Sequence, residues 1–186
     1  MKRFFDLTIV ILSMPVLFLP GLLISLLIIL TSEGPPIHWS DRIGRNKHIF
    51  KMPKYRTMMI DTPQKATHLL EDPDSFITPI GRFLRKTSLD ELPQLWSILK
   101  GDMSFVGPRP ALFNQDDLVQ LREERGINVL TPGLTGWAQI NGRDELSIID
   151  KVDLETEYLK KQSFLLDVII MARTIINAVK SKEISH

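Results

Sequence analysis

Cysteine is absent from this chain, which excludes disulfides and thiolate chemistry. Histidine is scarce, and the four that occur show no ligand spacing, so a histidine-based zinc site is not expected. The formal net charge is only +1, whereas a nucleic-acid binder normally carries a large basic excess. The chain also lacks a P-loop, a dinucleotide fingerprint and an HExxH motif. These absences exclude several common classes of enzyme and predict no nucleic-acid partner.

A long hydrophobic run, LTIVILSMPVLFLPGLLISLLIIL, covers residues 7–30, and no charge lies between Asp6 and Glu33. As a helix this run would extend about 36 Å, enough to cross a hydrocarbon layer of roughly 30 Å. It is too long for the core of a signal peptide, and no small-residue cleavage pattern follows it. The run therefore predicts a membrane segment, with a buried helix of a soluble protein as the alternative.

Two features of this run favour a helix that re-enters its own side of the membrane over one that spans it. Pro15 and Pro20 interrupt the run, and Gly21 follows the second proline, so a bend near Pro20 would leave two arms too short to span alone. Positive residues, which mark the cytoplasmic side, flank both ends of the run. They are Lys2 and Arg3 before it, and Arg42, Arg45, Lys47, Lys51, Lys54 and Arg56 after it.

The expected fold is α+β and mainly helical, with a re-entrant membrane helix hairpin in residues 1–31 and one small cytoplasmic catalytic domain in residues 32–186. Two stretches, IHWSDRIG (37–44) and HIFKMPKYRTM (48–58), predict short strands or extended segments, with a turn at 44–46. Loops are expected at residues 60–76, which could include a short helical turn, and at 101–111 and 131–143. Helices are expected at four places, some of them interfacial. These helices cover residues 81–86, 88–100, 114–125 and 163–180.

The segment TSLDELPQLW (87–96) places two carboxylates, Asp90 and Glu91, just before Pro93. Ser88 and Glu91 fit the S-x-x-E capping box, in which both side chains bind backbone N–H groups at a helix start. The same carboxylates, held ionised at a positive helix end, are also suited to nucleophilic attack or to binding Mg²⁺. Capping and catalysis both remain open on these residues alone.

A second chemistry-bearing segment is GPRP (107–110), which holds Arg109 between two prolines. The stiff backbone lets a guanidinium bind a phosphate with little loss of freedom, although a structural ion pair with Asp102 or Glu91 is the alternative. Gly133, Gly136 and Gly142 allow close backbone approach to a ligand. Carboxylates and arginines on a chain with a membrane segment favour a diphosphate substrate with a metal ion.

Several long strings, in order, resemble the bacterial sugar transferases known as phosphoglycosyl transferases. They are KRFFD with the proline-broken helix, KYRTM (54–58), FLRKTSLDELPQLWSILKGDMSFVGPRP (83–110), PGLTGWAQINGR (132–143) and SFLLD (163–167). The resemblance covers nearly the whole chain and is greatest to the small monotopic members. It departs from the family in having Leu19-Pro20 where Ser-Pro is common, and in having Pro53 before Lys54, which favours an edge or irregular strand.

The resemblance implies transfer of sugar-1-phosphate from a nucleotide sugar to undecaprenyl or another polyprenyl phosphate. By the same resemblance the nucleotide is expected to be UDP. This is the first membrane step of polysaccharide, O-antigen, capsule or glycoprotein synthesis. It implies that Asp90 is the nucleophile, that Asp90 and Glu91 hold Mg²⁺, and that further residues bind the substrates. These are Lys54, Arg85, Arg109, Gln139, Arg143 and Asp167.

The implied location is the cytoplasmic face of the bacterial inner membrane, in contact with its lipids. Two alternatives stay open: a non-enzymatic adaptor that binds anionic lipid, and a single-step metal-dependent transferase without a covalent intermediate. The sequence leaves open which sugar is carried and whether the chain forms a homo-oligomer.

Overall fold

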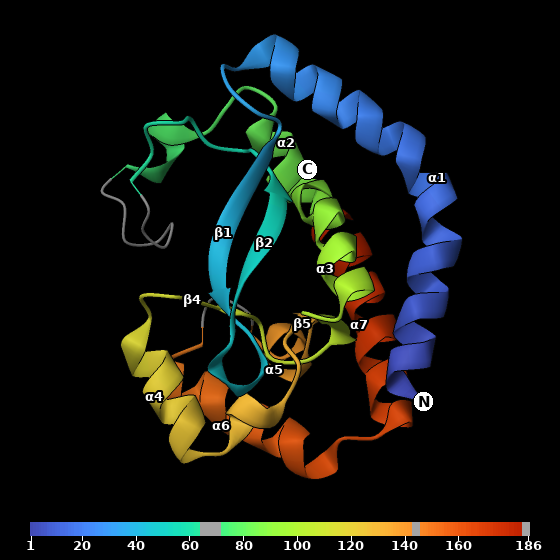
Figure 1. Cartoon of the computed structure of the whole chain (residues 1–186), viewed down its shortest axis with the longest axis vertical. Coiled ribbons are helices and arrows are strands. Elements are labelled where there is room, and N and C mark those ends of the chain that lie inside the picture. Colours follow the sequence, from blue (N-terminus) through green and yellow to red (C-terminus); the bar gives the residue numbers. More distant parts are fainter. Residues whose placement is uncertain (64–71, 143–145, 184–186) are drawn as a thin grey trace. The chain divides into compact units, whose positions relative to one another are not determined.

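The computed structural model describes residues 1–63, 72–142 and 146–183, and its elements are mainly helical (Figure 1). The α-helices are α1 (Lys2–Thr31), α2 (Gly81–Thr87), α3 (Leu95–Lys100), α4 (Asp116–Glu124), α5 (Trp137–Ile140), α6 (Ile148–Lys161) and α7 (Phe164–Glu183). Short 3-10 helices are η1 (Arg45–Lys47), η3 (Pro73–Phe76), η4 (Leu89–Gln94) and η5 (Ile127–Val129). The strands are β1 (Ile37–Ile43), β2 (Ile49–Tyr55), β3 (Ser104–Val106), β4 (Ala111–Leu112) and β5 (Gly133–Thr135).

The chain divides into two compact units. Unit 1 contains Met1–Leu7, Asp41–Phe50 and Ile98–His186, and unit 2 contains Thr8–Ser40 and Lys51–Ser97. This division does not follow the expected boundary at residue 31, because the first turns of α1 belong to unit 1. The division into anchor and catalytic domain stays a prediction.

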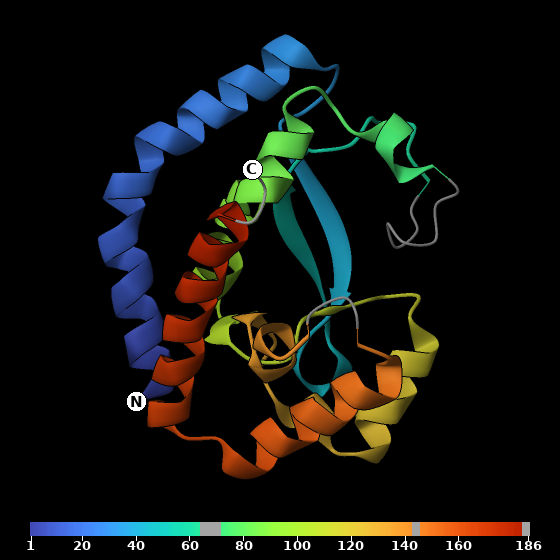
Figure 2. The same ribbon diagram turned by 180° about the vertical axis from the view of Figure 1, so that it is seen from behind.

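Helix α1 is one continuous helix that contains both Pro15 and Pro20. Figures 1 and 2 show that it changes direction part-way along its length, as expected for a helix that loses backbone hydrogen bonds at proline. Among the described residues it is the one helix long and apolar enough to cross a membrane. The structure thus confirms a long apolar N-terminal helix, whereas it shows no turn that separates two arms.

The two predicted strands are confirmed as β1 and β2, which lie side by side in the three-stranded sheet of order β2-β1-β4 (Figure 1). Strand β4 pairs with β1 antiparallel, with Arg42 opposite Leu112. Strand β2 lies at an edge of this sheet, which confirms the effect predicted for Pro53, because proline lacks the N–H that a central strand needs.

Two of the segments expected to be loops, 101–111 and 131–143, contain further short elements. Strands β3 and β5 pair in parallel, with Ser104 opposite Gly133 and Val106 opposite Thr135. Helix α5 follows β5 directly. The prediction of loops was therefore wrong at these points, because three residues are too few for a periodic pattern and the pairing joins segments far apart in the chain.

Each unit has its own apolar cluster. In unit 1 the largest buried side chains include Val106, Leu118, Val152, Tyr158 and Ile170, which come from β3, α4, α6 and α7. In unit 2, Ile24 and Ile28 of α1 pack with Tyr55 and Leu84. One face of α1 is therefore covered by β2 and α2, whereas many of its other apolar side chains are exposed.

Candidate active site

The two adjacent carboxylates, Asp90 and Glu91, lie in the 3-10 helix η4 and are half-buried. Ser88 precedes them in a left-handed conformation (φ 55°, ψ 18°), and its N–H ends α2 by donating to the Arg85 carbonyl at 3.2 Å. Regular α-helix begins only at Leu95, after Pro93. The predicted helix over 88–100 is thus a 3-10 turn followed by a short α-helix.

The capping-box interpretation of Ser88 was wrong. An N-cap residue needs an extended backbone so that its side chain can reach the N–H groups of the first turn. Ser88 is left-handed instead, and its side chain makes no capping hydrogen bond. The serine closes the preceding helix with its backbone, so capping no longer accounts for the carboxylates beside it.

Lys54 forms an ion pair with one of these carboxylates. Its Nζ lies 3.0 Å from Glu91 Oε1, and the two side chains are 18% and 19% exposed. A partly buried pair is less screened by water than a surface pair, so Lys54 places a fixed positive charge next to the carboxylate pair. Strand β2 and helix η4 thus bring together two residues 37 positions apart in the chain.

Arg85 lies in the last turn of α2 and donates from Nε to Thr57 Oγ1 at 2.9 Å. This bond ties α2 to the segment that follows β2. Unit 2 therefore contains four of the residues proposed from the sequence: Lys54, Arg85, Asp90 and Glu91.

The GPRP segment lies in unit 1, and its backbone is bound at every residue. The Gly107 N–H donates to the Thr135 carbonyl at 2.9 Å, and the Gly133 N–H donates to the Pro108 carbonyl at 2.9 Å. The carbonyl of Arg109 accepts from Arg122 at 3.0 Å, and the carbonyl of Pro110 accepts from Arg42 at 3.2 Å. The Arg109 side chain is exposed, so a fixed backbone presents a solvent-accessible guanidinium.

Two of the glycines expected to approach a ligand approach backbone instead. A Cβ at Gly133 would lie 2.1 Å from the Gly107 nitrogen, and a Cβ at Gly136 would lie 2.1 Å from the Gly107 carbonyl oxygen. No side chain fits at these distances, so glycine is required where β5 meets the GPRP segment. The third, Gly142, has φ 154°, which favours glycine for its backbone.

Helix α5 carries Gln139, whose amide oxygen and nitrogen are both buried, with no hydrogen-bond partner within the described part of the chain. An unpaired buried amide is costly, so this side chain is a candidate to bind a ligand group. On the same helix, Trp137 donates from Nε1 to Glu157 at 3.0 Å and lies under Arg173, 5.9 Å from ring centroid to guanidinium carbon. Arg143 lies outside the described residues.

Asp167 is buried near the start of α7, and both of its carboxylate oxygens are bound. Lys2 Nζ lies 2.6 Å from Oδ2, and the Tyr158 hydroxyl donates to Oδ1 at 2.6 Å. Burial, followed by the hydrogen bond to Asp167, raises the pKa of Tyr158, so the hydroxyl remains a donor. These contacts show Asp167 as an anchor for the N-terminus, and its substrate-binding role stays a prediction.

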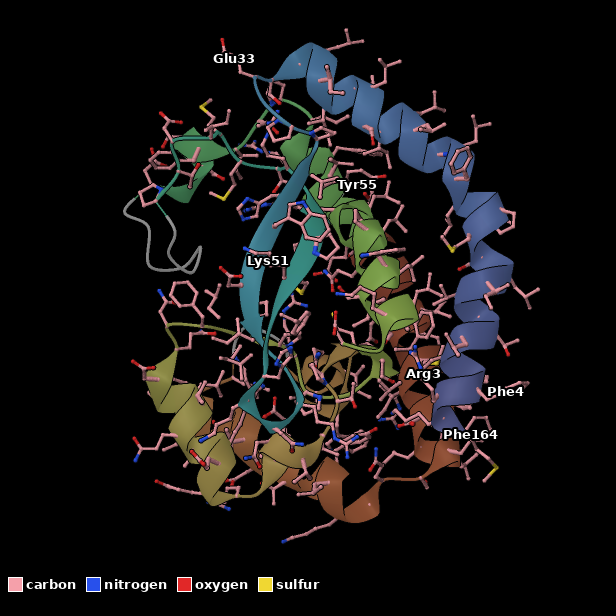
Figure 3. The ribbon with its side chains drawn as sticks, in the orientation of Figure 1. Arg3, Phe4, Glu33, Lys51, Tyr55 and Phe164 are labelled. Carbon is pink, nitrogen blue, oxygen red and sulfur yellow. The ribbon has the colours of Figure 1, made fainter. Side chains whose placement is uncertain are left out.

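Other contacts hold the first turns of α1 to unit 1. Arg3 donates to the carbonyls of Ile98 and Leu99 at the end of α3, the second at 2.7 Å. Phe5 and Phe164 stack edge to face with ring centroids 5.1 Å apart. Figure 3 shows Arg3 and Phe4 pointing to different sides of α1, and Phe4 is 78% exposed.

The sequence reading missed two polar clusters, Lys2–Tyr158–Asp167 and Arg122–Glu155. One signal was available: Glu155 lies three residues from both Val152 and Tyr158, on the buried face of α6. A charge at such a position usually has a buried partner. That partner is not identifiable from spacing, because it lies 33 residues away on another helix.

A group of three or more histidine, aspartate or glutamate side chains able to hold a metal ion is not found among the described residues. Mg²⁺ nevertheless fits the Asp90–Glu91 pair, because Mg²⁺ in phosphate-transfer sites commonly uses one or two carboxylates, with waters and substrate phosphates as the other ligands. Two adjacent, half-buried carboxylates meet that requirement.

The chain matches the bacterial sugar transferase family over residues 1–181, and it therefore belongs to this family. It is 38% identical over 192 residues to an uncharacterized sugar transferase, EpsL, of Bacillus subtilis, which covers all of this chain and 91% of the relative. The resemblance inferred from the sequence motifs is thus confirmed.

Two longer relatives are also similar to this chain. A UDP-galactose-lipid carrier transferase of Erwinia amylovora is 36% identical over 191 residues, covering 94% of this chain and 39% of that protein. An undecaprenyl-phosphate glucose phosphotransferase of Komagataeibacter xylinus is 38% identical over 192 residues, covering 97% of this chain and 36% of that protein. The chain thus spans well under half the length of these two relatives.

Proposed function

We propose that this protein transfers sugar-1-phosphate from a nucleotide diphosphate sugar, with UDP as the nucleotide, to undecaprenyl phosphate or a related polyprenyl phosphate. The observation that carries the proposal is the pair Asp90–Glu91, half-buried on a 3-10 turn beside Lys54, in a member of the bacterial sugar transferase family. The names of the longer relatives support both the sugar-phosphate transfer and the lipid acceptor.

In the first half-reaction a carboxylate oxygen of Asp90 attacks the phosphorus that bears the sugar. An Asp90–phosphorus bond forms, and the bond from that phosphorus to the bridging oxygen breaks. The nucleoside monophosphate leaves with the bond's electron pair on its phosphate oxygen, so little protonation of the leaving group is needed. The product is a phosphosugar attached to Asp90.

In the second half-reaction a phosphate oxygen of the polyprenyl phosphate attacks the same phosphorus. The bond to Asp90 breaks, the carboxylate is regenerated, and the lipid carries the sugar on a diphosphate. The attacking phosphate is already anionic, so no strong general base is required. A covalent step lets a water-soluble donor and a membrane lipid use one site in turn.

Side chains of each unit suit this chemistry. Lys54 offsets the negative charge around Glu91, and Arg109 offers a planar donor that binds phosphate in a bidentate manner. Asp90 and Glu91 would hold Mg²⁺, which supplies further neutralisation of the diphosphate's charge. Gln139, with its buried unpaired amide, is a second candidate to bind the donor.

We also infer that α1 re-enters the membrane, with the catalytic part on the cytoplasmic face of the inner membrane. Support comes from both ends of the helix, which are bound to polar groups of the rest of the chain. The Phe105 N–H donates to Asp6 at 3.3 Å, and Arg56 donates to the Ser32 carbonyl at 3.0 Å. A spanning helix would put these two ends on opposite sides of the bilayer.

The second part of α1 is also tied to β2. The Tyr55 hydroxyl donates to the Gly21 carbonyl at 2.9 Å, and a Cβ at Gly21 would come within 2.9 Å of that hydroxyl (Tyr55 is labelled in Figure 3). Glycine after Pro20 therefore gives room for a donor from outside the helix. This contact ties α1 to β2 directly after Pro20, which supports a bend at that proline.

The decisive experiment is a panel of nucleotide sugars offered with undecaprenyl phosphate to the protein in lipid nanodiscs, scored for nucleoside monophosphate release. Release that depends on both the lipid and one donor is expected. Intact-protein mass spectrometry with donor alone should show a phosphosugar adduct. Release without any adduct would favour a single-step transferase, and no release with any donor would refute the proposed activity.

Topology has a separate test, made simple because the chain has no cysteine. Single cysteines placed before Lys2 and at exposed Asn177 should both be protected from a membrane-impermeant reagent added to intact cells. Labelling of the first site alone would mean that α1 spans the bilayer.

A further inference from the structure

Beneath the GPRP segment, two helices of unit 1 share a buried ion pair. Arg122 of α4 and Glu155 of α6 are 8% and 2% exposed, and the two helices lie side by side in Figures 1 and 2. Arg122 Nε donates to Glu155 Oε2 at 2.8 Å, and its Nη2 donates to Glu155 Oε1 at 2.5 Å. The pair therefore has the parallel two-bond geometry of a guanidinium and a carboxylate.

The same Nη2 atom also donates to the carbonyl of Arg109 at 3.0 Å. A terminal guanidinium nitrogen carries two hydrogens, so one serves Glu155 and the other serves the GPRP backbone. Glu155 holds the guanidinium plane in place, and the guanidinium in turn fixes the carbonyl of Arg109. The exposed side chain of Arg109 is thus connected to a buried charge through its own backbone.

Fold stability alone does not explain why charges occupy these positions. Leu118, one turn before Arg122, and Val152 and Tyr158, on either side of Glu155, are core residues. Apolar side chains at both positions would extend that core, and replacing a buried ion pair in this way is often neutral or stabilising. What apolar side chains would lack is a donor for the Arg109 carbonyl.

We propose that the Arg122–Glu155 pair is a positioning device for Arg109, which fixes the backbone from which that guanidinium meets the donor diphosphate. This inference rests on the proposed function. Neither residue of the pair touches the substrate. Their effect passes through the Arg109 carbonyl and the direction of its side chain.

The principal variant is R122M/E155L, which removes both charges together and leaves no buried ion unpaired. We expect an unchanged or higher melting temperature, together with a fall in kcat/KM for the nucleotide sugar of about a hundredfold, as a displaced binding group can cause. A purely structural pair would lower activity only as far as it lowered the folded fraction. If R122M/E155L does not fold, R122K keeps the charge but not the planar fork, and about a tenfold fall is expected.

A double-mutant cycle with R109A tests whether the pair acts through Arg109. Once Arg109 is removed, adding R122M/E155L should lower kcat/KM by no more than about twofold, because coupled residues are not additive. If the combined variant lost kcat/KM by the product of the two separate factors, the pair would act independently of Arg109 and the proposal would be overturned. The matched control is R125Q/D153N. It removes the exposed ion pair between Arg125, just after α4, and Asp153 of α6, whose charged atoms lie 3.2 Å apart, and it should leave kcat/KM unchanged.

Hydrogen exchange supplies a readout that needs no activity. The amides of Gly107 and Gly133, which donate to the Thr135 and Pro108 carbonyls, should lose protection in R122M/E155L and in R122K, and keep it in R125Q/D153N. Unchanged protection in both pair variants would overturn the proposal even if activity fell. If the wild-type protein released no monophosphate with any donor, the proposed function would fail, while exchange would still decide whether the pair holds the segment.

Discussion

Ser88–Glu91 and Ser147–Asp150 have the same local pattern, a serine followed three residues later by a carboxylate. Ser147 is extended (φ −60°, ψ 160°), and its hydroxyl accepts from the Asp150 N–H at 3.1 Å, which caps α6. Ser88 is left-handed and caps nothing with its side chain. One carboxylate segment therefore caps a helix, whereas the other lies beside Lys54 and caps none.

The difference comes from what precedes each serine. Helix α2 ends at Thr87, so Ser88 must turn the chain out of one helix before the next begins. Ser147 follows Leu146, which is not helical, and takes the extended conformation that an N-cap needs. The same serine–carboxylate spacing therefore forms a side-chain cap at Ser147 and none at Ser88. Mutations in the two segments should have different effects on stability and activity.

The largest expected effect is on catalysis. D90N should lower kcat for monophosphate release by at least about a thousandfold, because an amide does not replace a carboxylate nucleophile. The matched change D150N, in the capping segment, should leave activity within about twofold of wild type. A D90N protein with full activity would refute the nucleophile assignment and erase the functional difference between the two segments.

The second prediction concerns the metal. E91Q should raise the Mg²⁺ concentration needed for half-maximal activity by about tenfold to a hundredfold, since it removes one of the two anionic ligands proposed for the ion. A Mg²⁺ titration of initial rates measures this. An unchanged Mg²⁺ requirement in E91Q would show that the ion is held elsewhere, and D150N serves again as the control.

The third prediction concerns the cap. S147A should lower the free energy of unfolding by about 1 kcal/mol, because the first turn of α6 loses an acceptor for the Asp150 N–H. S88A should change it by less than about 0.5 kcal/mol, since that side chain makes no cap. Chemical denaturation in detergent measures both variants. Equal losses of unfolding free energy in S147A and S88A would contradict the conclusion that only Ser147 caps a helix.

The smallest effect should be a gain. S88G is expected to raise the free energy of unfolding by about 0.5 to 1 kcal/mol, because glycine adopts φ 55° without the steric cost of a Cβ, which exceeds its added entropy in the unfolded chain. S147G should not stabilise the protein. A loss of stability in S88G, measured in the same denaturation assay, would mean that the serine has a side-chain contact of its own.

Much of the fold was predictable because its signals are local. The apolar run became α1, the alternating segments became β1 and β2, and the amphipathic C-terminal run became α7. Pro53 correctly indicated an edge strand. Errors fell on short elements, such as β3, β5 and η4, whose existence depends on partners elsewhere in the chain. The longer helix α6 was not predicted either.

For the candidate site, the sequence alone determined which residue types are present: two adjacent carboxylates and an arginine held between prolines. Tertiary structure decided how they are used. It turned Ser88 away from capping, bound both oxygens of Asp167 to Lys2 and Tyr158, and placed Arg122 under Arg109. The physical reason is that spacing along the chain reports only neighbours within a turn or two, whereas the partners of a buried polar group are brought to it by packing.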